Sequence, residues 1–161
     1  MPTEIERKFL VKNTSWMEGV TPTYYCQGYI PTLNGATVRV RIGGNKAYIC
    51  IKSIVVNISR SEFEYPISIE DAKDILHKLC AKPLIEKNRY KIQRGELLWE
   101  IDVFEKDNKG LIVAEVELKS EQDKVELPDW ILKEVTGVAR YYNSMLVKYP
   151  YSKWTKEEKS L

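Results

Sequence analysis

Charged and apolar residues alternate along most of this chain, and that alternation restricts it to a fold built largely from strands. Side chains two residues apart lie on the same face of a β-strand, so each alternating segment has one charged face and one apolar face. Turn sequences such as Gly43-Gly44-Asn45 and the DNKG of 107–110 separate these segments. The predicted strands cover residues 3–11, 23–30, 36–42, 46–53, 58–68, 84–93, 96–104 and 112–119.

Helical patterns occur in three other segments, which are residues 70–80, 129–135 and 140–148. The first has an apolar stripe of Ile75, Leu76 and Leu79 behind an acidic first turn. The second follows a proline and begins at Asp129, a residue type that caps helices. The tail from Ser152 to Leu161 is highly charged, so we expect it to be frayed.

The composition is that of one globular domain over residues 1–161, with 43% hydrophobic and 30% charged residues. The formal net charge is only +2, so bulk attraction to nucleic acid is weak and we expect no nucleic-acid partner. No apolar run approaches the roughly 18 residues that span a bilayer, and the N-terminus lacks an apolar signal-peptide core. The three scattered cysteines suit free thiols, so we expect a cytoplasmic protein without a membrane partner.

Eight strands joined by hairpin-length turns predict an α+β fold, in which an antiparallel eight-stranded sheet closes into a barrel, or tunnel. A few helices would pack outside, against the apolar face of the sheet. The opposite face carries almost only ionisable side chains, together with Gln27 and Tyr29. Its carboxylates are Glu4, Glu6, Glu62, Glu64, Glu100, Asp102, Glu115 and Glu117, and its bases are Lys8, Arg39, Arg41, Lys52, Arg60, Lys87 and Arg89.

This charged face has two interpretations: the solvated side of an amphipathic sheet, or the lining of a water-filled tunnel. Its charges come as like-sign doublets, such as Glu4-x-Glu6 and Arg39-x-Arg41, whose members repel by on the order of 1 kcal/mol near a protein surface. A counter-ion between the members removes that repulsion, and the fitting ions are a divalent cation for carboxylates and phosphate oxygens for bases. We therefore expect a hydrated tunnel that binds a polyphosphate together with metal ions.

The metal that such a tunnel can bind is restricted by its donor atoms. The chain has one histidine, His77, which lies in a predicted outer helix. A zinc site built from several histidines is therefore excluded within one copy of the chain. Carboxylates and water select hard cations such as Mg²⁺ or Mn²⁺.

The same residues resemble the sequence signature of the CYTH superfamily, also called the triphosphate tunnel metalloenzymes. The opening EIERK is similar to the Glu-x-Glu-x-Lys motif of that family, and the resemblance extends from about Thr3 to Leu146. Further elements follow in the family's order, namely QGY (27–29), VRVR (38–41), IKS (51–53), SRSEFEYPI (59–67), IEKNRY (85–90), EIDVF (100–104), AEVEL (114–118) and RYYNSML (140–146).

The resemblance implies a tunnel enzyme that binds triphosphate compounds with Mg²⁺ or Mn²⁺. The chain looks most like the short bacterial members, whose usual activity is hydrolysis of inorganic triphosphate to diphosphate and phosphate. We expect that activity, with a small-molecule triphosphate as the partner. Hydrolysis of thiamine triphosphate or nucleoside triphosphates stays open, and so does a non-catalytic polyphosphate-binding module. The apolar, Trp-containing helices are compatible with a homodimer.

Shared faces and the resemblance together assign candidate roles to the charged side chains. The candidate metal ligands are Glu4, Glu6, Asp102, Glu115 and Glu117, partly carried over from family positions. The candidate substrate-binding residues are Lys8, Arg39, Arg41, Lys52 and Arg89. We expect Glu62, Glu64 and Glu100 to orient bases or bound water.

Hydrolysis also requires a group that accepts a proton from the attacking water. Arg89 and other neighbouring bases should lower the pKa of Lys87 and leave part of it as neutral amine. Tyr29 lies on the same inward face and can share a proton with that amine. We expect a Lys87–Tyr29 pair to be the catalytic base, with a hydroxide held by a metal ion or an acid such as Glu62 as the alternatives.

Overall fold

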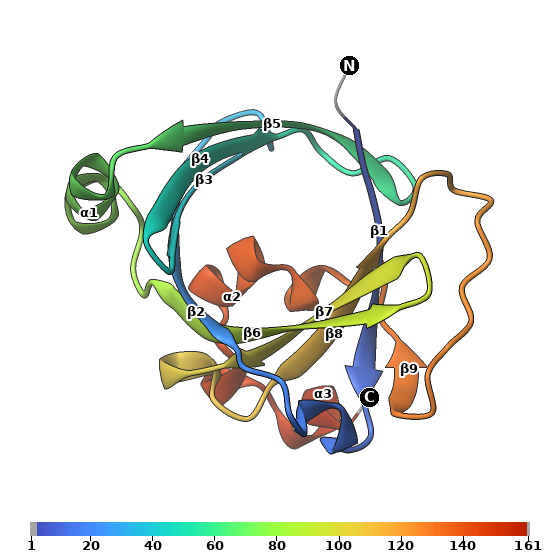
Figure 1. Ribbon diagram of the computed structural model, residues 1–161. Helices are drawn as coiled ribbons and strands as arrows, with labels where there is room; N and C mark the ends of the chain where they lie inside the picture. The colour runs from blue at the N-terminus through green and yellow to red at the C-terminus, as the bar shows by residue number, and fades with distance from the viewer. Residues whose placement is uncertain (1–2, 161) are drawn as a thin grey trace.

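Eight antiparallel strands close into a barrel in the computed structural model, which describes residues 3–160 (Figure 1). The order around the barrel is β1-β5-β4-β3-β2-β6-β7-β8, and β8 returns to β1. The predicted fold class, an α+β protein with a closed eight-stranded antiparallel barrel, is confirmed. The strands are β1 (Thr3–Val11), β2 (Thr23–Ile30), β3 (Thr37–Gly43), β4 (Lys46–Lys52), β5 (Ser59–Ile67), β6 (Ile85–Arg94), β7 (Leu97–Phe104) and β8 (Ile112–Glu117).

The barrel is closed by β1, which divides one of its edges between two partners. Residues Thr3–Ile5 pair with β5, whereas Phe9–Val11 pair with a ninth strand, β9 (Ile131–Glu134). The prediction of a helix over residues 129–135 is therefore wrong, because Ile131–Glu134 form a strand. This edge of β1 would be left unpaired beyond β5, and β9 satisfies it with backbone hydrogen bonds from Val135 N to Lys8 O (2.9 Å) and from Lys12 N to Trp130 O (2.9 Å).

The apolar face of the barrel points outward and is covered in separate patches. Helix α1 (Ile69–Lys78) starts at Ser68, whose hydroxyl accepts a hydrogen bond from Asp71 N at 3.0 Å. Its buried Ala72 and Leu76 pack with Val40 of β3 and with Ala47 of β4. On another side the rings of Trp16, Trp99 and Trp130 cover β1, β7 and β8, together with Phe9.

The remaining short helices are η1 (Ser15–Met17), η2 (Lys106–Asn108), η3 (Ala139–Tyr141), α2 (Asn143–Lys148), η4 (Tyr151–Lys153) and α3 (Lys156–Lys159). The helix predicted over residues 140–148 is thus divided into η3 and α2. Helix α2 also differs from the expectation that helices only cover the outside, because Asn143 and Ser144 line the barrel interior. Figure 1, which looks along the barrel, shows α2 within the outline of the ring. No helix among residues 3–160 is long and apolar enough to cross a membrane.

The C-terminal tail is ordered by an aromatic cluster, so the expectation that it is frayed is wrong for the residues described. Trp154 is 5% exposed, and its ring centroid lies 5.1 Å from that of Tyr141 and 5.0 Å from that of Tyr151. After it, Thr155 and Glu158 form a capping box that starts α3. A charged composition did not reveal this because the order depends on the packing of one tryptophan ring against distant aromatic side chains.

Replacing Trp154 with alanine tests whether the tail belongs to the hydrophobic core. We expect Trp154→Ala to lower the free energy of unfolding by about 3–5 kcal/mol, because a large buried side chain is lost and a cavity remains. Urea denaturation measures the change. The neighbouring exposed Lys153 is the control, and Lys153→Ala should alter stability by less than about 0.5 kcal/mol. Equal effects of the two variants would contradict the assignment.

Candidate active site

The inward charged side chains of every barrel strand except β2 converge inside the barrel, as the alternation predicts, and most of them line two cavities. The interpretation of this face as an ordinary outer surface is therefore excluded. The cavities share the side chains of Glu6, Arg39, Lys52, Arg89 and Glu115. Since these residues belong to both linings, we describe the two cavities as adjoining halves of one tunnel.

The two halves differ in charge. The first, which we call the basic half, is lined by six basic residues and by only two acidic residues, Glu6 and Glu115. Its lining also includes Tyr142, Asn143 and Ser144, which come from the segment that enters α2. The second, which we call the acidic half, is lined by seven acidic and five basic residues. An anion and a group of cations can therefore be held side by side along the tunnel.

Asp102 forms the most deeply buried ion cluster of the tunnel. Its Oδ1 accepts a hydrogen bond from Arg89 Nε at 2.7 Å, and its Oδ2 accepts one from Arg89 Nη2 at 2.8 Å. Lys87 Nζ donates to the same Oδ2 at 2.7 Å. Burial alone would raise the pKa of Asp102, but the charges of Arg89 and Lys87 outweigh burial and hold that pKa below its usual value. Both oxygens of Asp102 are thus occupied by basic side chains.

Lys87 has the most perturbed amine of the basic half. Its side chain is 1% exposed, and its Nζ lies 5.6 Å from the ring centroid of Phe104. Burial lowers the pKa of Lys87 to about 7, with Arg89 acting in the same direction and Asp102 opposing it. A neutral amine is therefore available near neutral pH.

Tyr29 and Lys87 line the same cavity but are not hydrogen-bonded to each other in the part of the chain that the structure describes. Two amides connect them instead. Lys87 Nζ donates to Asn143 Oδ1 at 3.0 Å, and Gln27 Nε2 donates to the same oxygen at 3.3 Å and to the Tyr29 hydroxyl at 2.9 Å. Burial raises the pKa of Tyr29, so its phenol keeps its proton.

Glu4 holds two bases together on the other side of the tunnel. Its carboxylate accepts hydrogen bonds from Lys52 Nζ at 2.8 and 3.0 Å and from Arg60 Nε at 2.9 Å. Burial raises the pKa of Glu4, yet the two ion pairs outweigh burial and lower that pKa overall. Glu4 and Lys52 come from β1 and β4, so this contact depends on the closure of the barrel through β5.

Glu6, Glu115 and Glu117 gather where β1 pairs with β8: Glu6 lies opposite Glu117 in register, and Lys8 lies opposite Glu115. Lys8 Nζ lies 3.6 Å from Glu115 Oε1 and 4.0 Å from Glu6 Oε1. Burial and the repulsion of Glu115 raise the pKa of Glu6 to about 8. The pKa of Glu115 is lowered despite burial, because the neighbouring bases, Lys8 most of all, outweigh it. The pair therefore holds one proton at neutral pH, and a divalent cation can replace it.

Arg39 and Arg41, which the sequence treats as a pair, have different surroundings. Arg39 Nη2 lies 3.3 Å from Glu64 Oε2 and lines both halves of the tunnel. Arg41 lines only the acidic half and makes no ion pair with a carboxylate among residues 3–160. Its guanidinium lies 4.7 Å from the ring centroid of Tyr25, and burial with the nearby Arg39 and Arg89 lowers its pKa. Arg41 is thus a part-buried cation that makes no ion pair among the residues described.

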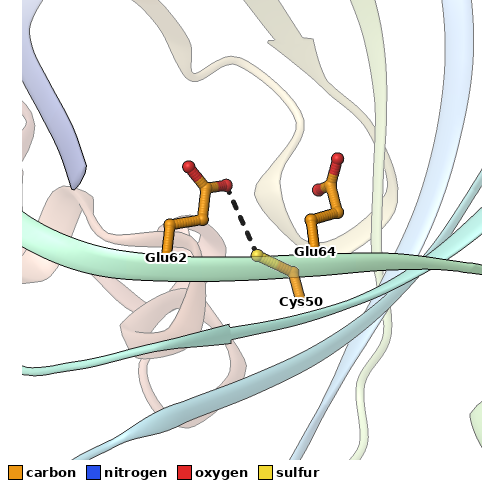
Figure 2. Close-up of side chains that lie close together, drawn as sticks. All are labelled: Cys50, Glu62 and Glu64. Carbon is orange, nitrogen blue, oxygen red and sulfur yellow. Dashed lines mark hydrogen bonds between the residues drawn. The ribbon is translucent and has the colours of Figure 1, made fainter. Parts of the chain in front are cut away.

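Cys50 also faces the tunnel, between Glu62 and Glu64 of β5 (Figure 2). Its Sγ lies 3.4 Å from Glu62 Oε1, and one ligand atom of each residue lies within 4.8 Å of the others. Burial raises the pKa of the Cys50 thiol to about 11, although Arg39 and Lys52 oppose the shift. The protonated thiol donates a hydrogen bond to Glu62 and does not suit a nucleophile.

Several residues that line this site were not predicted from the sequence. Tyr142, Asn143 and Ser144 line the basic half because the chain returns to one end of the barrel before α2. Tyr25 lines the acidic half, where Gly43 on the paired strand leaves room for its ring. Inward alternation along residues 23–30 could have indicated Tyr25. No local pattern could have indicated Asn143, since its position depends on a long-range return of the chain.

Comparisons with known proteins agree with a charged tunnel of this kind. Residues 2–142 match the CYTH domain family, and the chain belongs to that family. An inorganic triphosphatase of Acetivibrio thermocellus is 46% identical over 151 residues, which cover 94% of this chain and 97% of that protein. The crystal structure of the inorganic triphosphatase NE1496 has a TM-score of 0.65 at 31% identity, and the match covers 91% of this chain and 95% of that one.

A more distant structure shares the fold alone. The PH1012 protein from Pyrococcus horikoshii OT3 has a TM-score of 0.57 at 20% identity, over 73% of this chain and 79% of that one. The resemblance to the CYTH superfamily that the sequence motifs indicate is therefore confirmed by both the sequence match and the fold.

Removing the charge of Asp102 tests the buried cluster. We expect Asp102→Asn to lower the free energy of unfolding by about 3–5 kcal/mol, because Lys87 and Arg89 lose their counter-charge while they stay buried. The matched control is Asp74→Asn on α1, where Asp74 is 65% exposed and lies 3.8 Å from Lys78. That substitution should cost less than about 1 kcal/mol. A similar loss from both variants, measured by urea denaturation, would contradict the proposed cluster.

Proposed function

We propose that this protein hydrolyses inorganic triphosphate to diphosphate and phosphate, with a divalent metal ion as cofactor. The single observation that supports this function most is the division of the tunnel into a basic half and an adjoining acidic half. A short chain of phosphates requires many donors along its length, and the metals that accompany it require carboxylates. The similarity to two inorganic triphosphatases supports the same substrate.

Substrate binding is assigned to bases that surround the basic half without being neutralised completely. Lys8, Arg39, Lys52 and Arg89 line it and come from four different strands, so they can contact phosphate oxygens from several sides. Arg41 lies further along, in the acidic half, where a part-buried cation that makes no ion pair among residues 3–160 suits one end of the anion. In the absence of substrate these bases are partly paired with carboxylates, which keeps the tunnel charge balanced.

The metal ligands that fit best are Glu6, Glu115 and Glu117, with Glu4 next to them on β1. Carboxylates that crowd until one retains a proton are a donor set suited to Mg²⁺ or Mn²⁺. Such an ion, when bound, would neutralise charge on the phosphate oxygens in the transition state. Asp102 is a predicted ligand, but both of its oxygens are engaged by Arg89 and Lys87, so we assign it the role of fixing those two bases.

Lys87 is the proposed general base. A water oxygen attacks a terminal phosphorus, its proton passes to the neutral Nζ of Lys87, and the P–O bond to the diphosphate leaving group breaks with its electron pair on the oxygen. Lys87 suits this role because its amine is buried, faces the basic half and is partly neutral near pH 7. Tyr29 lines the same cavity and supplies a hydroxyl for the attacking water or the phosphate.

A substrate panel tests the function. Phosphate release is measured from inorganic triphosphate, ATP and thiamine triphosphate, each with Mg²⁺, with Mn²⁺ and with a chelator. We expect the fastest turnover on inorganic triphosphate and none with the chelator. Glu115→Gln should lower the rate on the order of a hundredfold by weakening the metal site, whereas Glu70→Gln on the outside of α1 should not. Faster turnover of thiamine triphosphate or ATP would replace the proposed substrate, and binding without turnover would indicate a polyphosphate-binding module.

The pH dependence tests the general base. Because the pKa of Lys87 lies at about 7 and only the neutral amine accepts a proton, kcat/KM should rise about tenfold per pH unit below 7 and level off above it. The bound triphosphate stabilises the ammonium form, so the corresponding rise in kcat should occur at higher pH. Lys87→Ala should lower kcat by about 10²–10⁴-fold and remove this rise. A profile that keeps its shape in Lys87→Ala would exclude Lys87 and favour an acid such as Glu62.

A further inference from the structure

Two amides, those of the fully buried Gln27 and the part-buried Asn143, join Lys87 to Tyr29 and determine which way each group in the connection points. Lys87 Nζ donates a hydrogen bond to Asn143 Oδ1 at 3.0 Å, so the Asn143 amide presents its oxygen to the lysine. Gln27, which contacts the same oxygen at 3.3 Å, must then present its NH₂ group. That NH₂ group also reaches the Tyr29 oxygen at 2.9 Å, so the Tyr29 oxygen accepts this hydrogen bond. The phenolic proton of Tyr29 is consequently left to donate elsewhere, and Tyr29 lines the basic half.

The same contacts restrict the direction of the Lys87 amine. Asp102 Oδ2 at 2.7 Å and Asn143 Oδ1 at 3.0 Å take two of the tetrahedral positions around Nζ. A neutral amine has two hydrogens, so both can stay in these contacts when the third proton leaves. The lone pair then occupies the remaining position. Because Lys87 lines the basic half, this remaining position is the one available to a ligand there.

We propose that Asn143 and Gln27, which we call the amide bridge, are positioning residues that hold the Lys87 amine and the Tyr29 hydroxyl toward the substrate. Asn143 is the first residue of α2, so this helix is a working part of the active site and not only a cover for the barrel. The inference rests on the proposed function, since it assigns Lys87 the role of general base.

Gln27 positions its neighbours at a cost in the stability of the folded protein. It is fully buried, and its Oε1 has no hydrogen-bond partner among residues 3–160. An unsatisfied buried acceptor is unfavourable, and an apolar side chain of similar volume would avoid that cost. A purely structural role would lead us to expect the opposite, namely that the amide contributes to folding.

The experiment measures kcat, KM and melting temperature for four variants of the full chain. Asn143→Ala removes the acceptor, and Asn143→Asp keeps an oxygen in its place. Gln27→Glu keeps the shape of the side chain but removes the donor, and Gln27→Met removes the polar groups. The control is Lys148→Ala, an exposed residue at the other end of α2. Turnover of inorganic triphosphate by the unaltered protein, measured in the same series, reports separately on the proposed function.

We expect Asn143→Ala and Gln27→Glu to lower kcat by about ten- to a hundredfold, the range for losing a hydrogen bond to a charged or reacting group, with KM changed less than about threefold. Asn143→Asp should recover most of the loss only in alkaline buffer, because the added carboxylate stabilises the ammonium form of Lys87 and moves the rise in kcat to higher pH. Gln27→Met should lower kcat while the melting temperature stays equal or rises. The double variant Asn143→Ala/Gln27→Glu should lose little more than the worse single variant, because both residues act through one connection.

Three results would overturn the amide bridge while the proposed function stands. They are an unchanged kcat in Asn143→Ala, a rise in KM with constant kcat, which indicates direct phosphate binding, and a parallel fall of kcat and melting temperature in Gln27→Met.

A readout without turnover covers the case in which triphosphate is not the substrate. The Lys87 side-chain NH₃⁺ signal in ¹⁵N NMR, assigned by its loss in Lys87→Arg, should exchange faster with solvent in Asn143→Ala than in Lys148→Ala. Equal exchange would count against the bridge.

Discussion

A closed barrel with its charged face inside must neutralise those charges without bulk water, and the rest of this structure follows from that constraint. A buried charge is tolerated only when it is paired and hydrogen-bonded. Asp102 meets the requirement for two bases at once, and Glu4 does the same for Lys52 and Arg60. These contacts cross between strands, so the lining of the tunnel and the closure of the barrel depend on each other.

Neutralisation is incomplete in two places, and these places give the tunnel its chemistry. Glu6 retains a proton because Glu115 lies next to it in a buried position. Arg41 rests on the ring of Tyr25 without a carboxylate partner among the residues described. The first position suits a metal ion and the second suits an anion. The tunnel thus has one position for a metal ion and one for an anion, next to an amine that is partly neutral near pH 7. This combination is suited to a substrate that carries negative charge and metal ions together.

Much of the barrel could be predicted because alternation is a local property of the sequence. All eight barrel strands were found within one or two residues of their observed ends, and the inward residues followed from counting by two. Strand β9 was missed because its hydrogen bonds are supplied by β1, far away in the sequence, which outweighs the helical pattern of residues 129–135. The order of the tail was missed because it depends on one ring, that of Trp154, packing between others.

The candidate site was predictable as a set of side chains but not as a set of contacts. That Asp102 is held by Arg89 follows from the register between β6 and β7, which no residue spacing reveals. The place of Asn143 beside Lys87 follows from the path of the chain into α2. The individual metal-binding, substrate-binding and catalytic roles stay proposals. The single domain, the cytoplasmic location, the homodimer and the absence of nucleic-acid and membrane partners stay predictions.

The way β1 is shared among β5, β8 and β9 has a consequence for how the protein reaches its native state. β1 precedes β8 and β9 by about a hundred residues or more, so its edges stay only partly paired, through β5, until those two strands have been synthesised. Such distant pairing carries a large loop-closure entropy and is typical of slow folding. Glu4, Glu6 and Lys8 all lie on that strand, so a nascent or truncated chain has no assembled tunnel. The barrel therefore closes, and the binding site forms, in the same late step of folding.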